Sequence, residues 1–429
     1  MKIIEKHSSY GTAPADPELF TTAVVQGYSR SVTHVFSYGH FEFQLIRWLS
    51  QTTYSGAEIG ECLSTASKIK DGDIEGWMAE WRGLAERVEA IGRDCLTRGH
   101  RVSAREAFLR ATTYYEASFF FAPDDDPRKL ALYRRQRDAF RAAGALFDHP
   151  FEVARIPYEG GKTLPGYFLA VDDSGRPRPT IMINTGGDGT SERMYFSGGA
   201  AAGLRRGYNV LLWDGPGQPG TYLEDRSLVF RPDWEVPAGA ALDYLGTRDD
   251  VDHDRIAYAG YSMGGYFVPR SAGHDHRIAA GVALALTPEL WPGAGYSQVT
   301  NKEWFTSAPT EDELERDPKA RYAAMECAPR WGIPAGPSAI PAWGESLKRF
   351  SCAGLEDEIT CPILNISTTG EGKQWFDNAK AFFDRLPNPK NRFVLTTEDD
   401  GGELHCVRGN SSLAHQLTYD FLDEVLPAR

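Results

Sequence analysis

The serine within residues 260–264, whose one-letter sequence is GYSMG, is the side chain best suited to covalent chemistry. The segment matches the pattern G-x-S-x-G. It follows the apolar run 255–259 and precedes residues 266–268, so a strand is expected before Ser262 and a helix after it. Such a turn exposes a serine hydroxyl at the end of a sheet, and small residues on both sides permit the sharp turn. The pattern predicts that Ser262 is a nucleophile, and an ordinary glycine-rich turn is the alternative.

A histidine near the C-terminus is the expected base. Serine is a weak nucleophile at its free pKa, so it needs an adjacent base, which in turn needs an orienting carboxylate. Chains with this serine turn place the three residues in the order Ser, acid, His. Of ten histidines, only His405 and His415 follow the last predicted strand, residues 392–397. His415 falls inside the predicted helix 411–425, whereas His405 lies in the loop before it. We therefore expect His405 to be the base, against the alternative of a loop histidine without a catalytic role.

The acid is expected just after the predicted strand 362–366. The loop that follows, residues 367–373, contains one carboxylate, Glu371, between two glycines. Its expected role is to hold the tautomer of His405 and to stabilise the imidazolium. Asp377 is the second candidate, although it falls on the next predicted helix. The alternative for Glu371 is a solvent-exposed loop charge.

A tetrahedral intermediate also needs two backbone N–H donors. One is expected from Met263, the residue after the nucleophile. The other is expected from the loop 184–190, sequence NTGGDGT, which follows the predicted strand 180–183. Gly187 and Asp188 are both candidates for this second donor. A further segment at the same sheet edge, residues 213–218 with sequence WDGPGQ, is interpreted as a structural turn.

The elements that position these groups fall into two regions. Residues 1–148 predict a helical N-terminal domain, with apolar residues at helical spacing in 41–49, 74–91, 103–121 and 129–147. Residues 149–429 predict a catalytic domain that begins with an antiparallel pair, 151–156 and 166–171, and then alternates strands with helices. Strands are expected at 180–183, 209–213, 256–259, 278–286, 362–366 and 392–395. This alternation predicts a mostly parallel sheet with helices on both faces, which binds ligands at the carboxyl ends of its strands.

A long excursion interrupts the strand–helix rhythm at about residues 287–355. It is rich in Pro and Gly and contains four tryptophans, at positions 291, 304, 331 and 343. Long excursions in a compact domain are usually lids or binding loops. We expect a lid that lines the substrate site, with surface decoration as the alternative.

Composition excludes several classes of partner. The chain has 429 residues, and 46 basic against 59 acidic residues give a net charge of −13. This charge argues against nucleic acid and anionic membranes as partners. The N-terminus lacks a signal-peptide pattern, and no apolar run approaches the roughly 20 residues of a membrane helix. The six cysteines form no C-x-x-C pair, and neither a zinc-protease motif nor a nucleotide-binding loop is present. No cofactor and no metal is expected.

Several motifs lie along the chain in a fixed order. They are Trp77-x-x-x-Trp81, residues 99–107 and 110–115, residues 186–192, residues 214–218, the serine turn, Cys361-Pro362 and His405-Cys406. Over nearly its whole length the chain resembles the α/β-hydrolases that carry a helical N-terminal domain. That family includes 2,6-dihydroxypseudooxynicotine hydrolase and the fungal polyketide-shortening hydrolases of melanin pathways.

The resemblance implies an α/β-hydrolase fold with Ser262 as nucleophile and His405 as base. It places the acid at Glu371, where the dihydroxypseudooxynicotine enzyme has Asp. It also implies a cytoplasmic, metal-free homodimer with its active site between the two domains. Family members cleave esters and C–C bonds beside ketones, so we expect hydrolysis of a small aromatic or polyketide-like metabolite. A cyclase, acyltransferase or eliminating enzyme with the same triad is the second hypothesis, and a binding module without activity is the third.

Overall fold

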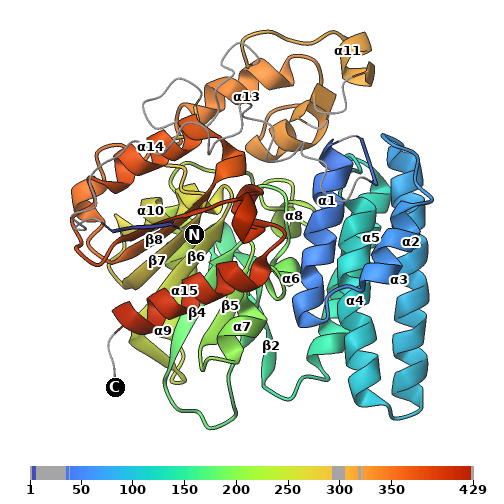
Figure 1. The fold of residues 1–429 in the computed structure, drawn as a ribbon, viewed down its shortest axis with the longest axis horizontal. Helices are drawn as coiled ribbons and strands as arrows, with labels where there is room; N and C mark the ends of the chain where they lie inside the picture. The colour runs from blue at the N-terminus through green and yellow to red at the C-terminus, as the bar shows by residue number, and fades with distance from the viewer. Residues whose placement is uncertain are drawn as a thin grey trace.

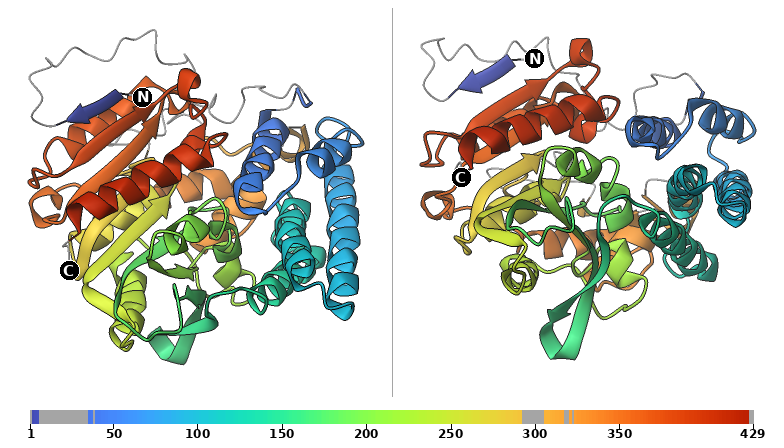
Figure 2. Two further views of the ribbon diagram at one scale, coloured as in Figure 1. Left: turned by 60° about the horizontal axis from the view of Figure 1, so that its bottom comes forward. Right: turned by 90° about the horizontal axis from the view of Figure 1, so that it is seen from below.

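The computed structural model describes residues 2–5, 35–37, 39–291, 305–316, 320–321 and 323–426. Its N-terminal part is helical, as expected. The helices are α1 (Gly39–Leu49), α2 (Ile59–Ala66), α3 (Ile74–Thr97), α4 (Arg101–Phe119) and α5 (Pro127–Gly144). Figures 1 and 2 both show them together at one side of the molecule, beside the sheet. Within the described ranges, none of the helices combines the length and apolar character needed to cross a membrane.

Buried aromatic side chains hold the helical segment together. Trp48, Trp77 and Trp81 are fully buried in one apolar cluster, and the indole N–H of Trp77 donates to the Ala117 carbonyl at 2.7 Å. The start of α3 is fixed by the carboxylate of Asp73, which accepts a hydrogen bond from the N–H of Gly76. Such a cap satisfies one of the unpaired N–H groups at a helix start.

The strands form one nine-stranded sheet in the order β1-β9-β8-β7-β6-β4-β5-β3-β2. Their bounds are β1 (Lys2–Glu5), β2 (Phe151–Tyr158), β3 (Lys162–Leu169), β4 (Arg178–Asn184), β5 (Asn209–Trp213), β6 (Val251–Tyr261), β7 (Ile278–Leu284), β8 (Ile363–Thr368) and β9 (Arg392–Thr396). Strands β4 to β9 pair in parallel, and β2 pairs with β3 antiparallel. The predicted mostly parallel sheet and its antiparallel start are confirmed. Strand β1, antiparallel to β9, was not predicted.

Both faces of the sheet are buried, because successive side chains of each strand enter different apolar clusters. Tyr258 packs into the cluster that contains residues of α9 (Glu235–Gly246), α10 (Gly264–Ala272) and α14 (Lys373–Phe383). Its neighbours Ala257 and Ala259 pack into the cluster that contains residues of α7 (Ala200–Leu204) and α15 (Ser411–Val425). Figure 1 shows α15 crossing one face of the sheet. Two-sided burial explains why these strands are almost entirely apolar.

The insertion, residues 287–355, leaves the sheet between β7 and β8. Its described helices include α11 (Glu311–Arg316) and α13 (Ala339–Leu347), with a 3₁₀ turn at Ala328–Trp331. The ring of Trp331 lies 4.3 Å from Phe230 and 5.2 Å from Trp343, centroid to centroid. The tryptophan predicted to share this role at position 304 lies outside the described residues. The described tryptophans pack with the insertion and its neighbours, so a substrate-lining role stays a prediction.

The helical segment contacts the sheet region through polar side chains of α5. The side-chain amide of Gln136 donates to the hydroxyl of Thr190 at 2.8 Å. Arg134 and Arg137 both form ion pairs at 2.8 Å with Glu224, which follows α8 (Pro219–Tyr222). Helix α5 is rich in arginine, and two of these side chains serve the contact with the sheet region.

Candidate active site

The turn that carries Ser262 joins β6 to α10. Ser262 has φ of 60°, a left-handed conformation that costs energy for a residue with a Cβ and is typical of nucleophile turns. A Cβ at Gly260 would lie 2.4 Å from the carbonyl oxygen of Gly264, so the glycine before the serine is sterically required. At Gly264 an added Cβ would be 3.7 Å from its nearest neighbour, but at Gly265 it would lie 1.9 Å from the Ala285 oxygen. Of the two glycines after the serine, Gly265 is therefore the one whose surroundings leave no room for a side chain.

Two hydrogen bonds connect the three predicted side chains. His405 Nε2 lies 2.8 Å from Ser262 Oγ, and His405 Nδ1 lies 2.7 Å from Glu371 Oε1. The carboxylate accepts from Nδ1–H, which leaves the lone pair of Nε2 toward the serine hydroxyl. His405 and Glu371 are each 3% exposed, and the indole of Trp375 lies 5.2 Å from the imidazole. The structure thus brings Ser262 into contact with His405, which is 143 positions away in the chain, while Glu371 and His405 are 34 positions apart.

Backbone contacts hold the acid in place. Oε2 of Glu371 accepts from the N–H of Thr368 at 3.2 Å, and Oε1 also accepts from the N–H of Cys406 at 3.4 Å. The N–H of Gly370 donates to the Glu403 carbonyl at 2.9 Å, which ties the loop of the acid to the loop of the histidine. The orientation of the carboxylate is therefore set by both loops.

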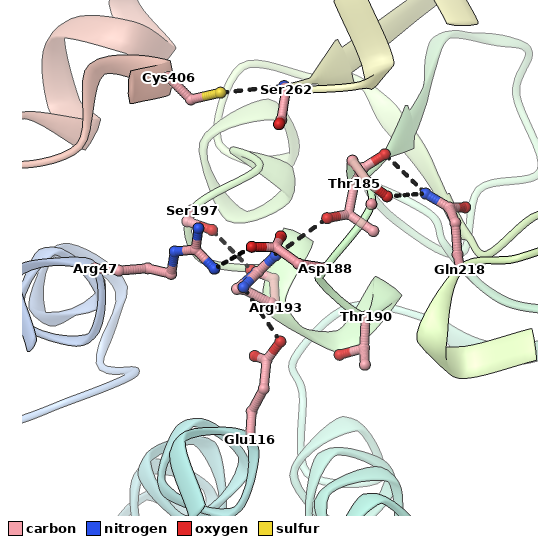
Figure 3. Close-up of polar contacts among 12 residues, drawn as sticks. Arg47, Glu116, Thr185, Asp188, Thr190, Arg193, Ser197, Gln218, Ser262 and Cys406 are labelled. Carbon is pink, nitrogen blue, oxygen red and sulfur yellow. Dashed lines mark hydrogen bonds and ion pairs between the residues drawn. The ribbon is translucent and has the colours of Figure 1, made fainter. Parts of the chain in front are cut away.

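Cys406 links the histidine loop to the nucleophile turn. Its sulfur accepts a hydrogen bond from the backbone N–H of Ser262 at 3.1 Å (Figure 3). Cys406 and Val407 both have φ of 58°, so the chain turns sharply after the histidine. The sequence contains the His405-Cys406 pair as a motif, but its spacing does not reveal this contact.

The two rejected candidates lie elsewhere. Asp377 is exposed on α14 and pairs with Lys373. His415 is buried in α15, where its ring nitrogens lie 3.3 Å from the Tyr54 hydroxyl and 3.3 Å from the Ser197 carbonyl. Burial lowers the pKa of His415 to about 4. Neither residue contacts Ser262.

The loop predicted to supply the second N–H donor runs directly beside the nucleophile turn. A Cβ at Gly186 would lie 2.7 Å from the Cβ of Ser262 and 3.0 Å from the backbone nitrogen of Met263. The loop can approach this closely only because position 186 has no side chain. Gly187 follows, with an ideal Cβ position 3.9 Å from the sulfur of Met263. The backbone of this loop and that of Met263 therefore lie close together next to Ser262.

A partly buried ionic cluster holds the end of the same loop. The Asp188 carboxylate lies 3.1 Å from Arg47 of α1 and 3.2 Å from Arg193 of α6 (Ser191–Met194). Arg193 also lies 3.4 Å from Glu116 of α4, as Figure 3 shows. Burial alone would raise the pKa of Asp188, but the two guanidinium groups hold it well below its usual range. The sequence predicted a backbone role for Asp188 and did not predict its arginine partners.

Arg47 and Gln218 are the main residues near the site for which the sequence predicted no role there. Arg47 is a cation within the apolar run of residues 45–49 in α1, and that position is the signal that could have marked it. Gln218 ends the segment interpreted as a structural turn, and its side chain hydrogen-bonds to the loop of Gly187. In the described part of the chain, no three His, Cys, Asp or Glu side chains are arranged to hold a metal ion.

Comparisons with known proteins relate the chain to a family. No protein-family model matches the chain. It is 40% identical over 428 residues to "Alpha/beta hydrolase psoB" of Aspergillus fumigatus, which covers 92% of this chain and 95% of the relative. It is 32% identical over 416 residues to "Alpha/beta hydrolase gkaG" of Penicillium citrinum, with 90% and 95% covered.

One solved structure extends the likeness to the fold of most of the chain. The crystal structure of the 2,6-dihydroxy-pseudo-oxynicotine hydrolase superposes with a TM-score of 0.67 at 20% identity. The superposition covers 88% of this chain and 95% of that one. At this identity the likeness concerns the fold alone, and it includes the helical segment.

Proposed function

Because the chain belongs to the α/β-hydrolases and is an enzyme of that type, we propose that it is a serine hydrolase with Ser262, His405 and Glu371 as its triad. Its proposed substrate is a small aromatic or polyketide-like metabolite, cleaved at an ester or at a C–C bond next to a ketone. The observation that carries the proposal is the unbroken hydrogen-bond chain from Ser262 Oγ through the imidazole to the Glu371 carboxylate.

The first step is attack on a carbonyl carbon. His405 Nε2 takes the proton of Ser262 while Oγ forms a bond to the carbon, and the carbonyl π electrons move to its oxygen. Glu371 stabilises the imidazolium and keeps it oriented. The N–H of Met263 and an N–H from the loop of Gly187 would donate hydrogen bonds to the oxyanion, the former carbonyl oxygen on which the negative charge develops.

The second step expels the leaving group. When the oxyanion collapses, the bond from the carbonyl carbon to the alkoxide or to the α-carbon of an enolate breaks, and His405 gives its proton to that group. Water then attacks the acyl-enzyme by the same route and releases an acid and free Ser262. An enolate leaving group requires a second carbonyl beside the broken bond, which is why a β-dicarbonyl compound is the proposed C–C substrate.

Hydrolysis in ¹⁸O-labelled water tests the proposal. Esters and β-diketones with aromatic or polyketide-like groups are supplied as substrates, and the products are analysed by mass spectrometry. We expect one ¹⁸O atom in the carboxylic acid product. Product formed without label would instead support a cyclase, acyltransferase or eliminating enzyme with the same triad.

A further inference from the structure

The side chain of Gln218 is the most completely bonded amide next to the nucleophile. Its Nε2 donates to the carbonyl of Thr185 at 2.7 Å and to that of Gly186 at 3.0 Å. Its Oε1 accepts from Asn184 Nδ2 at 3.1 Å and from the N–H of Gly215 at 2.6 Å. A glutamine side chain offers two donors and two acceptor lone pairs, so all four are used. Gln218 is fully buried.

These four contacts allow only one orientation of the amide. Rotating it by 180° would place Oε1 against two carbonyl oxygens and Nε2 against two N–H donors. Asn184 is itself fixed, because its Nδ2 also donates to the Trp213 carbonyl at 2.8 Å and its Oδ1 accepts from the Tyr258 hydroxyl at 2.5 Å. The amide of Gln218 therefore has a rigid support in the core of the sheet.

The consequence for the loop follows from the geometry of the peptide bond. In a trans peptide the C=O of one residue and the N–H of the next point in opposite directions, and no described peptide bond is cis. Because Gln218 holds the Gly186 carbonyl, the N–H of Gly187 must point away from Gln218. Figure 3 shows Gln218 and Ser262 on opposite sides of Thr185. The same loop lies against the nucleophile turn, because a Cβ at Gly186 would be 2.7 Å from the Cβ of Ser262 and 3.0 Å from the nitrogen of Met263.

We propose that Gln218 is a positioning residue that aims the N–H of Gly187 at the oxyanion. The inference rests on the proposed function, and it selects Gly187 over Asp188 as the second donor. Preorganised donors of this kind contribute because they need no reorientation when the charge develops. Gln218 acts through the peptide group and has no contact with the substrate in this role.

The experiment measures the rate of phosphonylation by a fluorophosphonate, which needs no natural substrate. Ser262 Oγ forms a bond to phosphorus, fluoride leaves, and the serine proton passes to His405. The developing charge on the phosphoryl oxygen uses the same two donors. In Gln218→Glu a carboxylate replaces the amide without a change of shape and faces the two carbonyl oxygens. We expect the labelling rate at pH 8 to fall about 10²-fold, the lower end of the effect of losing one such donor.

A pH series separates positioning from a merely structural role. The ratio of the variant's labelling rate to the wild-type rate should rise as the pH falls from 8 to 5, because the new carboxyl gains a proton and recovers one donor. Asn209→Asp is the matched control. Asn209 is buried, accepts a hydrogen bond from the N–H of Val171 at 2.9 Å and donates one to the Asp250 carbonyl at 2.9 Å. It lies at the start of β5, whereas Gln218 lies beyond the end of that strand. This control should label at close to the wild-type rate.

The outcomes distinguish the two proposals. Wild-type protein that does not label at Ser262 contradicts the proposed function. Wild-type labelling with an unchanged rate in folded Gln218→Glu overturns the positioning role, as does an equal loss in Asn209→Asp. If Gln218→Glu does not fold, Gln218→Met replaces it, because methionine keeps the side-chain length but cannot donate a hydrogen bond. A labelling rate of Gln218→Met within about threefold of the wild-type rate would then overturn the inference.

Discussion

Arg330 of the insertion and Asp124 of the helical segment form a buried ion pair, with Nε and Oδ2 3.2 Å apart and the side chains 3% and 5% exposed. Arg330 also donates to the carbonyl of Gly187. Burial raises the pKa of Asp124, but Lys129, at 2.7 Å, and Arg330 bring it below the ordinary value. The insertion, the helical segment and the loop beside the nucleophile therefore meet at one guanidinium.

Removing this guanidinium should affect both stability and reactivity. We expect Arg330→Ala to lower the free energy of unfolding by about 3 kcal/mol, because breaking a buried ion pair leaves a charge with fewer partners. The labelling rate of Ser262 should fall as well, because the Gly187 carbonyl loses its donor. Thermal denaturation and fluorophosphonate labelling measure the two effects. Arg316→Ala is the control, since Arg316 and its partner Asp312 are 81% and 79% exposed. Equal stability of both variants would contradict the prediction.

The role of Glu371 can be tested by changing its charge and its length separately. Glu371→Gln removes the acceptor that fixes Nδ1–H of His405, so turnover should fall by about 10³- to 10⁴-fold. Glu371→Asp keeps the charge and should retain more activity than Glu371→Gln. Asp377→Asn, at the exposed second candidate, should match the wild type. Steady-state kinetics compares the variants, with the substrate that is identified by hydrolysis in ¹⁸O-labelled water. Loss of turnover in Asp377→Asn alone would show that Asp377, and not Glu371, is the acid.

Glu116 predicts a specific dependence of stability on pH. Desolvation raises its pKa from 4.5 to about 7, against the opposing effects of Arg193 and Arg47. The folded state thus binds a proton that the unfolded state releases between these values, so stability is lost as the pH rises through this window. Glu116→Gln removes that dependence.

The measurement is denaturant unfolding of both proteins at pH 5 and pH 8. The stability of Glu116→Gln relative to the wild type should increase by roughly 3 kcal/mol between the two pH values. Comparing the two proteins cancels the titration of groups such as His415. If the difference in free energy of unfolding between the two proteins stays constant from pH 5 to pH 8, Glu116 ionises in the folded protein as it does in the unfolded chain.

Two neighbouring glycines should respond differently to alanine. Gly265→Ala places a methyl group 1.9 Å from the Ala285 carbonyl oxygen, whereas the same group at Gly264 would be 3.7 Å from its nearest neighbour. We expect Gly265→Ala to destabilise the fold by about 1–3 kcal/mol or more, as overpacking does. Gly264→Ala should cost much less. Melting temperatures measured side by side decide, and a larger loss in Gly264→Ala would contradict the geometry of the turn.

The sheet and the hydrogen-bonded set of Ser262, Glu371 and His405 could be predicted because local patterns mark them. The apolar runs predicted the strands from β2 to β9. The order Ser, acid, His along the chain, together with the loops that follow the last two strands, predicted Glu371 and His405. Strand β1 escaped prediction because a four-residue segment carries too little pattern. Its place depends on the antiparallel pairing with β9.

The polar contacts around the site could not be predicted for a different reason. Arg47 and Asp188 are 141 positions apart, and Asp124 and Arg330 are 206 apart, so no spacing rule connects them. Each pair exists because the packed helices, the insertion and the sheet bring distant segments together. The four hydrogen bonds of Gln218 likewise need the three-dimensional arrangement of two strand ends.

Mass spectrometry after fluorophosphonate treatment is the sharpest test of Ser262 as the nucleophile and His405 as its base. We expect a single adduct on the peptide that contains Ser262 and no adduct in Ser262→Ala. Labelling should be slowed by several orders of magnitude in His405→Ala, because members of a triad act as a unit. An adduct on another residue, or an undiminished rate in His405→Ala, would contradict these roles.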